Sequence, residues 1–184
     1  PLHLISIGHG DGEPVSFHPR NMIVAGAGST ATIVESHVGE GAYFSNGVTE
    51  ISVGERAVLN HYKLQNEGAE AYHLTANMVR IADRAVYDSF VLHVGGKLAR
   101  NEIRAELGER VECRLNGAYL ARGEQHIDNT TFIDHAAPNS SSREVYKGVL
   151  DESARGVFQG KILVRKDSQK TDGHQLNKTL LLSA

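Results

Sequence analysis

The sequence contains a single cysteine, Cys113, and no tryptophan. One cysteine cannot form an internal disulfide, so disulfide-stabilised secreted folds are excluded, and no second cysteine is available for a Cys-x-x-Cys motif. Such cysteine usage suits a reducing compartment, and we therefore expect a cytoplasmic location. The 184 residues are enough to bury a sizeable core without covalent support.

The sequence also lacks an excess of charge of one sign and a long apolar run. Its 19 basic and 22 acidic residues are interspersed and give a formal charge of −3, so no basic stripe for neutralising phosphates is present. Apolar runs such as Leu180–Leu182 are far shorter than the roughly 20 residues of a membrane-spanning helix. Nucleic acid and membrane are therefore not expected as partners.

Motifs of the common enzyme mechanisms are missing as well. No glycine-rich loop ends in Lys followed by Ser or Thr, which excludes a P-loop, and neither a Gly-x-Ser-x-Gly elbow nor a His-Glu-x-x-His motif occurs. From the sequence we assign no catalytic and no cofactor-binding residue, and we expect a protein that is not an enzyme.

The sequence does contain a regular recurrence of turn residues. Between the turns lie segments rich in Val, Ile, Leu, Tyr and Thr, without sustained helical spacing of apolar residues, which is typical of β-strands. The intervals between successive turns centre on about 14 residues, so the repeating unit is one strand and one short turn. The turn markers are Gly39, Gly54, Gly68, Asp83, Gly96, Gly108, Gly123, Ala137, Asp151 and Asp167.

Several of these segments alternate between apolar and polar residues. In Ala99–Leu107 charged side chains occupy every second position, which predicts one wet face and one buried face. In Val111–Tyr119 the inward set is Val111 and every second residue after it, which places Cys113 in the core as a small buried side chain. In Ala71–Val79 the residues that share a face are Tyr72, Leu74, Ala76 and Met78.

Two such units would complete one flattened coil of about 28 residues. Stacked coils pair each strand in parallel with its equivalent one coil away, so we predict an all-β fold, a right-handed parallel β-helix with two facing sheets, forming one domain over residues 1–184. An antiparallel sandwich or jelly roll would use similar strands, and the dipeptides Asn46-Gly47 and Asn116-Gly117 favour it locally. The regular period outweighs these two dipeptides.

Two groups of side chains are candidates for metal binding. The first group is evenly spaced at the length of one predicted coil and consists of His9, His37, Gln65 and His93. Stacked coils would align these side chains into a column that is either a polar ladder or a metal site.

The second group lies in residues 122–142, where His126, Asp128, Asp134 and His135 occur close together. Interleaved His and Asp can ligate iron or zinc or act as an acid–base pair, although their spacing matches no known ligand motif and an exposed turn would contain similar residues. The individual metal-ligand candidates are His126, His135 and Cys113, and we assign no metal site.

The most specific motifs lie in the last third of the chain, and further motifs lie upstream. The later segments are Arg143 with Val145–Val149, Ala154–Ile162, Gln169–Asp172, and Asn177 with Leu180–Ser183. The upstream segments are Pro19-Arg20, Val34–His37, Gly123–His126 and Asp134–Pro138. Together these segments resemble the core domain of the SufB/SufD family, the scaffold proteins of the SUF iron–sulfur cluster assembly system, and the upstream ones resemble its SufD branch.

This resemblance implies a right-handed parallel β-helix, in agreement with the spacing. It also implies a non-catalytic scaffold component of the SUF system that pairs with SufB and the ATPase SufC, in a complex that holds the iron–sulfur cluster. No cluster ligand carries over to this chain, so we expect it to bind no cofactor itself. The family also implies that the sequence is the core of a longer protein, without the N-terminal helical region and the C-terminal region that binds SufC.

Other hypotheses remain open. A β-solenoid or cupin-like metal-dependent enzyme would use similar strands, but the sequence has neither a His-x-His pair nor a hexapeptide repeat. A chain that itself holds an iron–sulfur cluster would usually supply about four thiolates, and this one has a single thiol. The isolated chain is also a candidate for homodimer formation.

Overall fold

The computed structural model describes residues 1–13 and 15–183, and in this part of the chain every regular element is a β-strand. No helix is present there, and so none that could cross a membrane. The strands are β1 Leu2–His9, β2 Val15–Phe17, β3 Arg20–Ala25, β4 Thr30–Glu40, β5 Tyr43–Val53, β6 Val58–Glu67, β7 Tyr72–Ile81, β8 Val86–His93, β9 Leu98–Leu107, β10 Glu112–Ala121, β11 His126–His135, β12 Ser141–Leu150, β13 Arg155–Val164 and β14 Asp172–Leu181.

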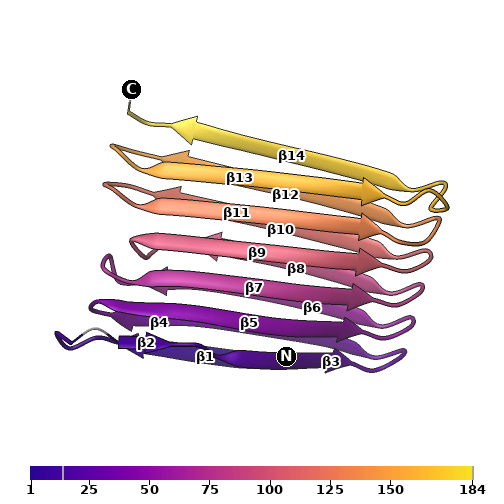
Figure 1. Cartoon of the computed structure of the whole chain (residues 1–184), viewed down its shortest axis with the longest axis horizontal. Coiled ribbons are helices and arrows are strands. Elements are labelled where there is room, and N and C mark those ends of the chain that lie inside the picture. Colours follow the sequence, from indigo (N-terminus) through magenta and orange to yellow (C-terminus); the bar gives the residue numbers. More distant parts are fainter. Residues whose placement is uncertain (14, 184) are drawn as a thin grey trace.

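Successive strands alternate between two seven-stranded sheets. Sheet A has the order β1-β4-β6-β8-β10-β12-β14, and sheet B has the order β13-β11-β9-β7-β5-β2, with β3 also beside β5. In Figure 1 the strands of sheet B run left to right in front, those of sheet A return behind them, and the chain climbs from bottom to top, so the coil is right-handed. The predicted right-handed parallel β-helix is confirmed.

All strand pairs between described residues are parallel, for example β6 with β8 and β7 with β9. The antiparallel sandwich and the jelly roll, on which the cupin-like alternative depended, are therefore wrong. The two dipeptides that favoured hairpins lie inside strands, Asn46-Gly47 in β5 and Asn116-Gly117 in β10.

The coil length is close to the predicted value but varies between coils. Val58 pairs with Val86, and Val86 pairs with Glu112, so the second of these coils is shorter than the first. The coil that separates Ser141 from its partner Asp172 is longer than both. The strands keep their parallel register throughout, so the turns absorb these differences.

The turns on one side of the coil stack through their backbones. Arg56, Arg84 and Arg110 adopt a positive φ of 56° to 58° there. The N–H of Arg56 donates to the carbonyl of Asp83, and that of Arg84 donates to the carbonyl of Glu109, in the next turn each time. Left-handed residues in tight turns explain why turn markers recur so evenly in the sequence.

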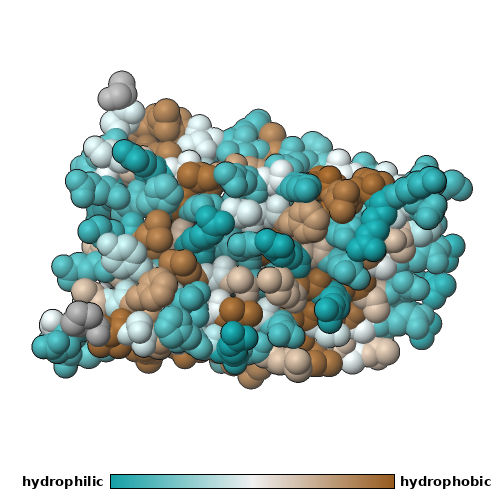
Figure 2. Space-filling model, in the orientation of Figure 1, coloured by the Kyte–Doolittle hydropathy of each residue, from teal (hydrophilic) through white to brown (hydrophobic). Residues whose placement is uncertain are grey.

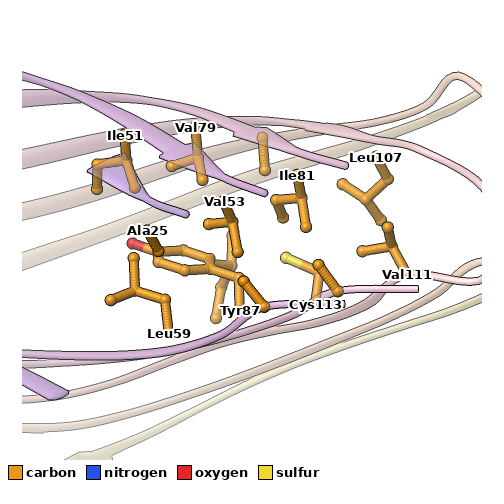
Figure 3. Packing of buried hydrophobic residues seen from close by; sticks show 14 of the residues in the cluster. Ala25, Ile51, Val53, Leu59, Val79, Ile81, Tyr87, Leu107, Val111 and Cys113 are labelled. Carbon is orange, nitrogen blue, oxygen red and sulfur yellow. The ribbon is translucent and has the colours of Figure 1, made fainter. Parts of the chain in front are cut away.

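The core between the sheets is apolar on the side of these turns. Figure 3 shows Ile51, Val53, Val79 and Ile81 of sheet B pointing toward Leu59, Tyr87 and Cys113 of sheet A. A smaller apolar cluster lies toward the other turns and contains Ala99, Tyr119, Ala121, Ile127 and Leu150. Buried polar side chains occupy much of the rest of the core.

Two tyrosines fill the space above two glycines on neighbouring strands. Gly117 pairs with Tyr146, and Tyr119 pairs with Gly148. A Cβ added to Gly148 would lie 2.1 Å from the Tyr119 ring, and one added to Gly117 would lie 2.4 Å from the Tyr146 ring. Each glycine therefore makes room for the tyrosine that covers it, which fits β10 and β12 together in one register.

The predicted burial patterns hold, with one difference. The inward sets of Ala99–Leu107 and Val111–Tyr119 are buried as expected. In β7 the apolar set that includes Tyr72 and Met78 does share a face, but that face points outward, while His73 and Asn77 are buried. The outer face of sheet B consequently mixes hydrophobic with hydrophilic side chains (Figure 2).

Candidate functional site

The four candidate residues of β11 do not converge. His126, Asp128 and Asp134 lie at outward positions, whereas His135 is buried and points inward. Asp128 accepts a hydrogen bond of 2.7 Å from Arg100, and Asp134 accepts one of 2.6 Å from Arg165.

His135 is held by two serine hydroxyls inside the coil. Its Nδ1 lies 2.7 Å from the Ser140 hydroxyl, and its Nε2 lies 2.9 Å from the Ser142 hydroxyl. In residues 1–13 and 15–183 no three His, Cys, Asp or Glu side chains come together in a metal-binding arrangement.

Cys113 points into the apolar cluster, between Tyr87 and Ser142 on the neighbouring strands. Its side chain is fully buried, and burial raises the pKa of the thiol far above its usual value, with Glu144 and Asp88 acting in the same direction. Because a thiolate is the reactive form, the native thiol should be inert.

We expect Cys113 to resist labelling by 5,5′-dithiobis(2-nitrobenzoic acid) in the native protein and to react promptly in denaturant, because only unfolding exposes the thiol. Absorbance at a single wavelength follows the reaction, and the unfolded chain serves as the control for complete labelling. Rapid stoichiometric labelling of the native protein would contradict the buried position.

The predicted histidine column exists in part. His37 pairs with Gln65, and Gln65 pairs with His93, so these three residues stack inside sheet A. His93 Nδ1 lies 3.4 Å from Gln65 Oε1, so the column is a polar ladder. His9 is not part of it, because the step from β1 to β4 is longer than predicted and places His9 beside Glu40.

This ladder belongs to a larger buried polar network, whose first centre is Glu35 on β4. Its two carboxylate oxygens accept hydrogen bonds from His61 Nε2 at 2.9 Å and from His37 Nε2 at 3.0 Å. Lys63 Nζ lies 3.8 Å from the same carboxylate, and the Tyr87 hydroxyl lies within hydrogen-bond distance of His61 Nδ1, at 3.0 Å. These side chains are at most 9% exposed.

The second centre of the network is Glu67 on β6. Its carboxylate accepts hydrogen bonds of 3.0 Å from Tyr43 and from Gln65, and His73 Nδ1 lies 2.8 Å away. The rings of His73 and His37 meet edge-on with their centroids 4.8 Å apart. Since His37 comes from sheet A and His73 from sheet B, this contact joins the two centres across the core.

The charges of the network stabilise one another. Burial alone would raise the pKa of Glu35, but the Lys63 ammonium and the hydrogen bonds from two histidines hold that pKa far below its usual value. Burial also opposes ionisation of Glu67, yet its hydrogen-bonding partners, led by His73, lower its pKa to about 2. Both carboxylates are therefore ionised, and each depends on its partners for compensation.

His93 makes the stability of this network depend on pH. Burial, aided by His73 and Lys63, lowers the pKa of His93 to about 3. The unfolded chain binds this proton near pH 6.5 and the folded chain does not, so the stability present above pH 6.5 is lost progressively as the pH falls toward 3.

Urea unfolding at pH 6.5, 5.5 and 4.5 should show this loss, with a contribution from His93 that approaches about 1.4 kcal/mol per pH unit. The variant His93→Gln cannot take up the proton, so its stability should fall less steeply by that amount. Equal slopes for the two proteins would show that His93 does not cause the dependence.

The polar interior continues into the later coils, where several of its groups have no hydrogen-bond partner. Both carboxyl oxygens of Glu144, the hydroxyl of Tyr146 and the side-chain polar atoms of Asn129 are buried without a hydrogen bond. Burial raises the pKa of Glu144 to about 7. Glu144 therefore has far less compensation for its burial than Glu35 has.

Sequence reasoning identified the ladder but missed the carboxylates and the lysine around it. Glu35 and Lys63 are separated by one coil and pair in register, as His37 and Gln65 do. Applying the offset of one coil to every charged residue would have found the pair.

The last strands of the described residues are β13 and β14. Most residues of β13 and β14 are exposed, including those that point toward the space between the sheets. Each of these strands ends the order of its sheet within residues 1–13 and 15–183. The apolar side chains left exposed at this end are Leu163, Val164, Leu180, Leu181 and Leu182, which are 38% to 66% exposed.

Comparison with known proteins shows which family the chain resembles. Residues 7–184 match the family model described as SUF system FeS cluster assembly, SufBD core domain. The chain is 30% identical to the iron–sulfur cluster assembly protein SufD of Escherichia coli, over 99% of this chain and 44% of that protein. It is 27% identical to an iron–sulfur cluster assembly SufBD family protein of Synechocystis, over 100% of this chain and 43% of that protein.

A further similar protein is the chloroplastic protein ABCI7 of Arabidopsis thaliana, which is 32% identical over 92% of this chain and 36% of that protein. The chain spans less than half the length of each of these three relatives.

Proposed function

The chain belongs to the SufBD core family of SUF iron–sulfur cluster assembly proteins, and from this we propose that it is a non-catalytic scaffold component that pairs with SufB and acts with the ATPase SufC. In the proposed pairing SufB contacts the surface formed by β13 and β14. We propose the cytoplasm as the compartment in which this assembly acts.

The observation that supports this pairing is the match to the SufBD core family over residues 7–184, on a coil of two parallel sheets whose last described strands carry exposed leucines. Strands of one chain can pair with a strand of another chain, and burial of apolar side chains adds to the affinity. A partner with a similar β-helix would continue both sheets.

We also propose that the iron–sulfur cluster is held by the assembled complex and that this chain alone binds none. Such clusters usually need about four thiolate ligands. The single thiol of this chain, Cys113, is fully buried in the apolar cluster.

The test is co-purification of the chain with SufB and SufC of the same species. We expect a complex with the wild-type chain and at least tenfold weaker binding by Leu181→Asp, because this change puts a charge on the proposed interface. The matched control is Ile7→Asp, which changes an exposed apolar residue of β1 at the opposite end.

Absence of a complex, or equal loss of binding in both variants, would contradict the proposal. Sedimentation of the chain alone tests the predicted homodimer at the same time. If the isolated chain is a dimer that Leu181→Asp dissociates, the surface around Leu181 pairs with itself when no partner is present.

A further inference from the structure

The outer face of sheet A carries a row of mostly apolar side chains that crosses the strands. The row, here called the sheet A stripe, is in register across six strands. Tyr62 and Phe90 are its most exposed aromatic members, at 39% and 37%. Leu64 and Leu92 form a second, half-buried apolar row beside it. The stripe consists of Val34, Tyr62, Phe90, Asn116, Val145 and Leu176.

Basic residues border the stripe on one side over the last three strands of sheet A and on the other side over the last two. Arg114, Arg143 and His174 lie in register on one side, and Lys147 and Lys178 lie in register on the other. The arginine of β10 is compensated, because it pairs with Asp88 and with Glu112.

The other cations next to the stripe lack such compensation. Among the described residues no carboxylate lies within ion-pair distance of Arg143, Lys147 or Lys178. Arg143, Lys147 and Lys178 are exposed, so their charges are available to a bound molecule. An apolar surface with Arg143 on one side and Lys147 and Lys178 on the other is complementary to an apolar surface with acidic borders.

The spacing of this surface matches an α-helix laid across the strands. Neighbouring strands are about 4.8 Å apart, close to the helical pitch of about 5.4 Å, so one turn of helix would meet each strand. Arg143 and Lys147 are four residues apart on β12, about 13 Å along the strand, which is close to the helix diameter of about 10–12 Å. From β6 to β14 the stripe covers about 19 Å, the length of about 13 helical residues.

We propose that the sheet A stripe docks an amphipathic α-helix of a partner protein, with its apolar side on the stripe and acidic residues along its borders. The helix axis lies across the strands, parallel to the axis of the coil. This surface is the outer face of sheet A, whereas the proposed SufB contact uses β13 and the inward side chains of β14, such as Leu181. The SufB contact and the docking of a helix on the sheet A stripe can therefore be tested separately.

The test uses two synthetic peptides of about 18 residues, long enough to form a helix, with the same leucine stripe and either Glu or Lys at its borders. Fluorescence anisotropy with the whole chain measures both dissociation constants. We expect the Glu-bordered peptide to bind at least tenfold more tightly at low salt, and its advantage to shrink as salt is added.

Variants of the chain locate the site. Phe90→Asp should weaken binding of the Glu-bordered peptide at least tenfold, and Arg143→Glu combined with Lys147→Glu should reverse the preference between the peptides. Met78→Asp is the matched control, because it changes a residue of similar exposure, 42%, on the outer face of sheet B. A urea unfolding midpoint equal to that of the wild type establishes that a variant folds. If Phe90→Asp does not fold, Tyr62→Ser is used in its place.

Three outcomes would overturn the proposal. The first is equal affinity for the two peptides, and the second is an equal loss of binding in Met78→Asp and Phe90→Asp. The third is a wild-type dimer that Phe90→Asp converts to a monomer, because a second copy of the chain would then occupy the stripe.

Discussion

Replacing Glu35 with leucine is expected to lower the free energy of unfolding by about 3–5 kcal/mol at pH 7, the usual cost of removing one partner of a buried ion pair. The carboxylate accepts hydrogen bonds from His61 and His37 and lies 3.8 Å from the Lys63 ammonium. Without it Lys63, which is 5% exposed and whose pKa burial already lowers, would lose the carboxylate that favours its charged form, and two imidazoles would lose an acceptor. Urea unfolding followed by circular dichroism measures the change.

The double variant Glu35→Leu, Lys63→Met separates the charge effect from the loss of packing. Because it removes both charges, it should recover much of the stability lost by the single variant. Glu50→Leu, on an exposed position of β5, is the control and should change stability by no more than about 0.5 kcal/mol. A single variant as stable as the wild type would mean that the Glu35 carboxylate does not compensate Lys63.

Replacing Glu144 with glutamine is expected to stabilise the protein by about 2–3 kcal/mol at pH 8 and to have little effect at pH 4. The pKa of this carboxyl group is about 7 in the folded chain, against 4.5 for its ordinary value, because it is buried. The folded chain therefore keeps this proton over a pH range in which the unfolded chain releases it. Stability is highest below pH 4.5 for this group and falls as the pH rises to 7.

Unfolding of the wild type and Glu144→Gln at pH 4, 6 and 8 measures this difference, which should grow with pH up to about 7. The control is Glu106→Gln, on an exposed position of β9, for which no such growth is expected. A stabilisation of equal size at pH 4 and pH 8 would show that ionisation of Glu144 is not its cause.

The spacing of turn residues predicted most of the architecture, because the same physical requirement determines the positions of the turn residues and the stacking of the coils. Stacked coils need a tight turn at the end of every strand, and residues such as Gly54, Asp83 and Gly108 begin those turns. The alternation in Val111–Tyr119 was enough to place Cys113 in the core, since both faces of that strand have distinct polarity.

The buried polar network could not be predicted in this way, because alternation identifies a polar face but not whether it is exposed. In β7 the polar face, with His73 and Asn77, is the buried one. The prediction that His9 joins the histidine column was wrong for a different reason. The number of residues between paired positions is larger from β1 to β4 than from β4 to β6. The sheet A stripe could be identified only from the observed strand register, because an error of one residue between strands would have put its residues out of line.

Because the turns absorb differences in coil length while the strands keep register, the chain should accept engineered insertions at its turns. The connection Ala136–Ser140 has five residues, and Arg165–Thr171 has seven, whereas Gly108–Val111 has four. An epitope or a fluorophore-binding loop placed at the tip of a long connection, such as next to Lys170, would leave every inward side chain on its own row. Reporters inserted at the turns of successive coils would then be separated by one strand spacing along the axis of the coil, which gives a set of known distances.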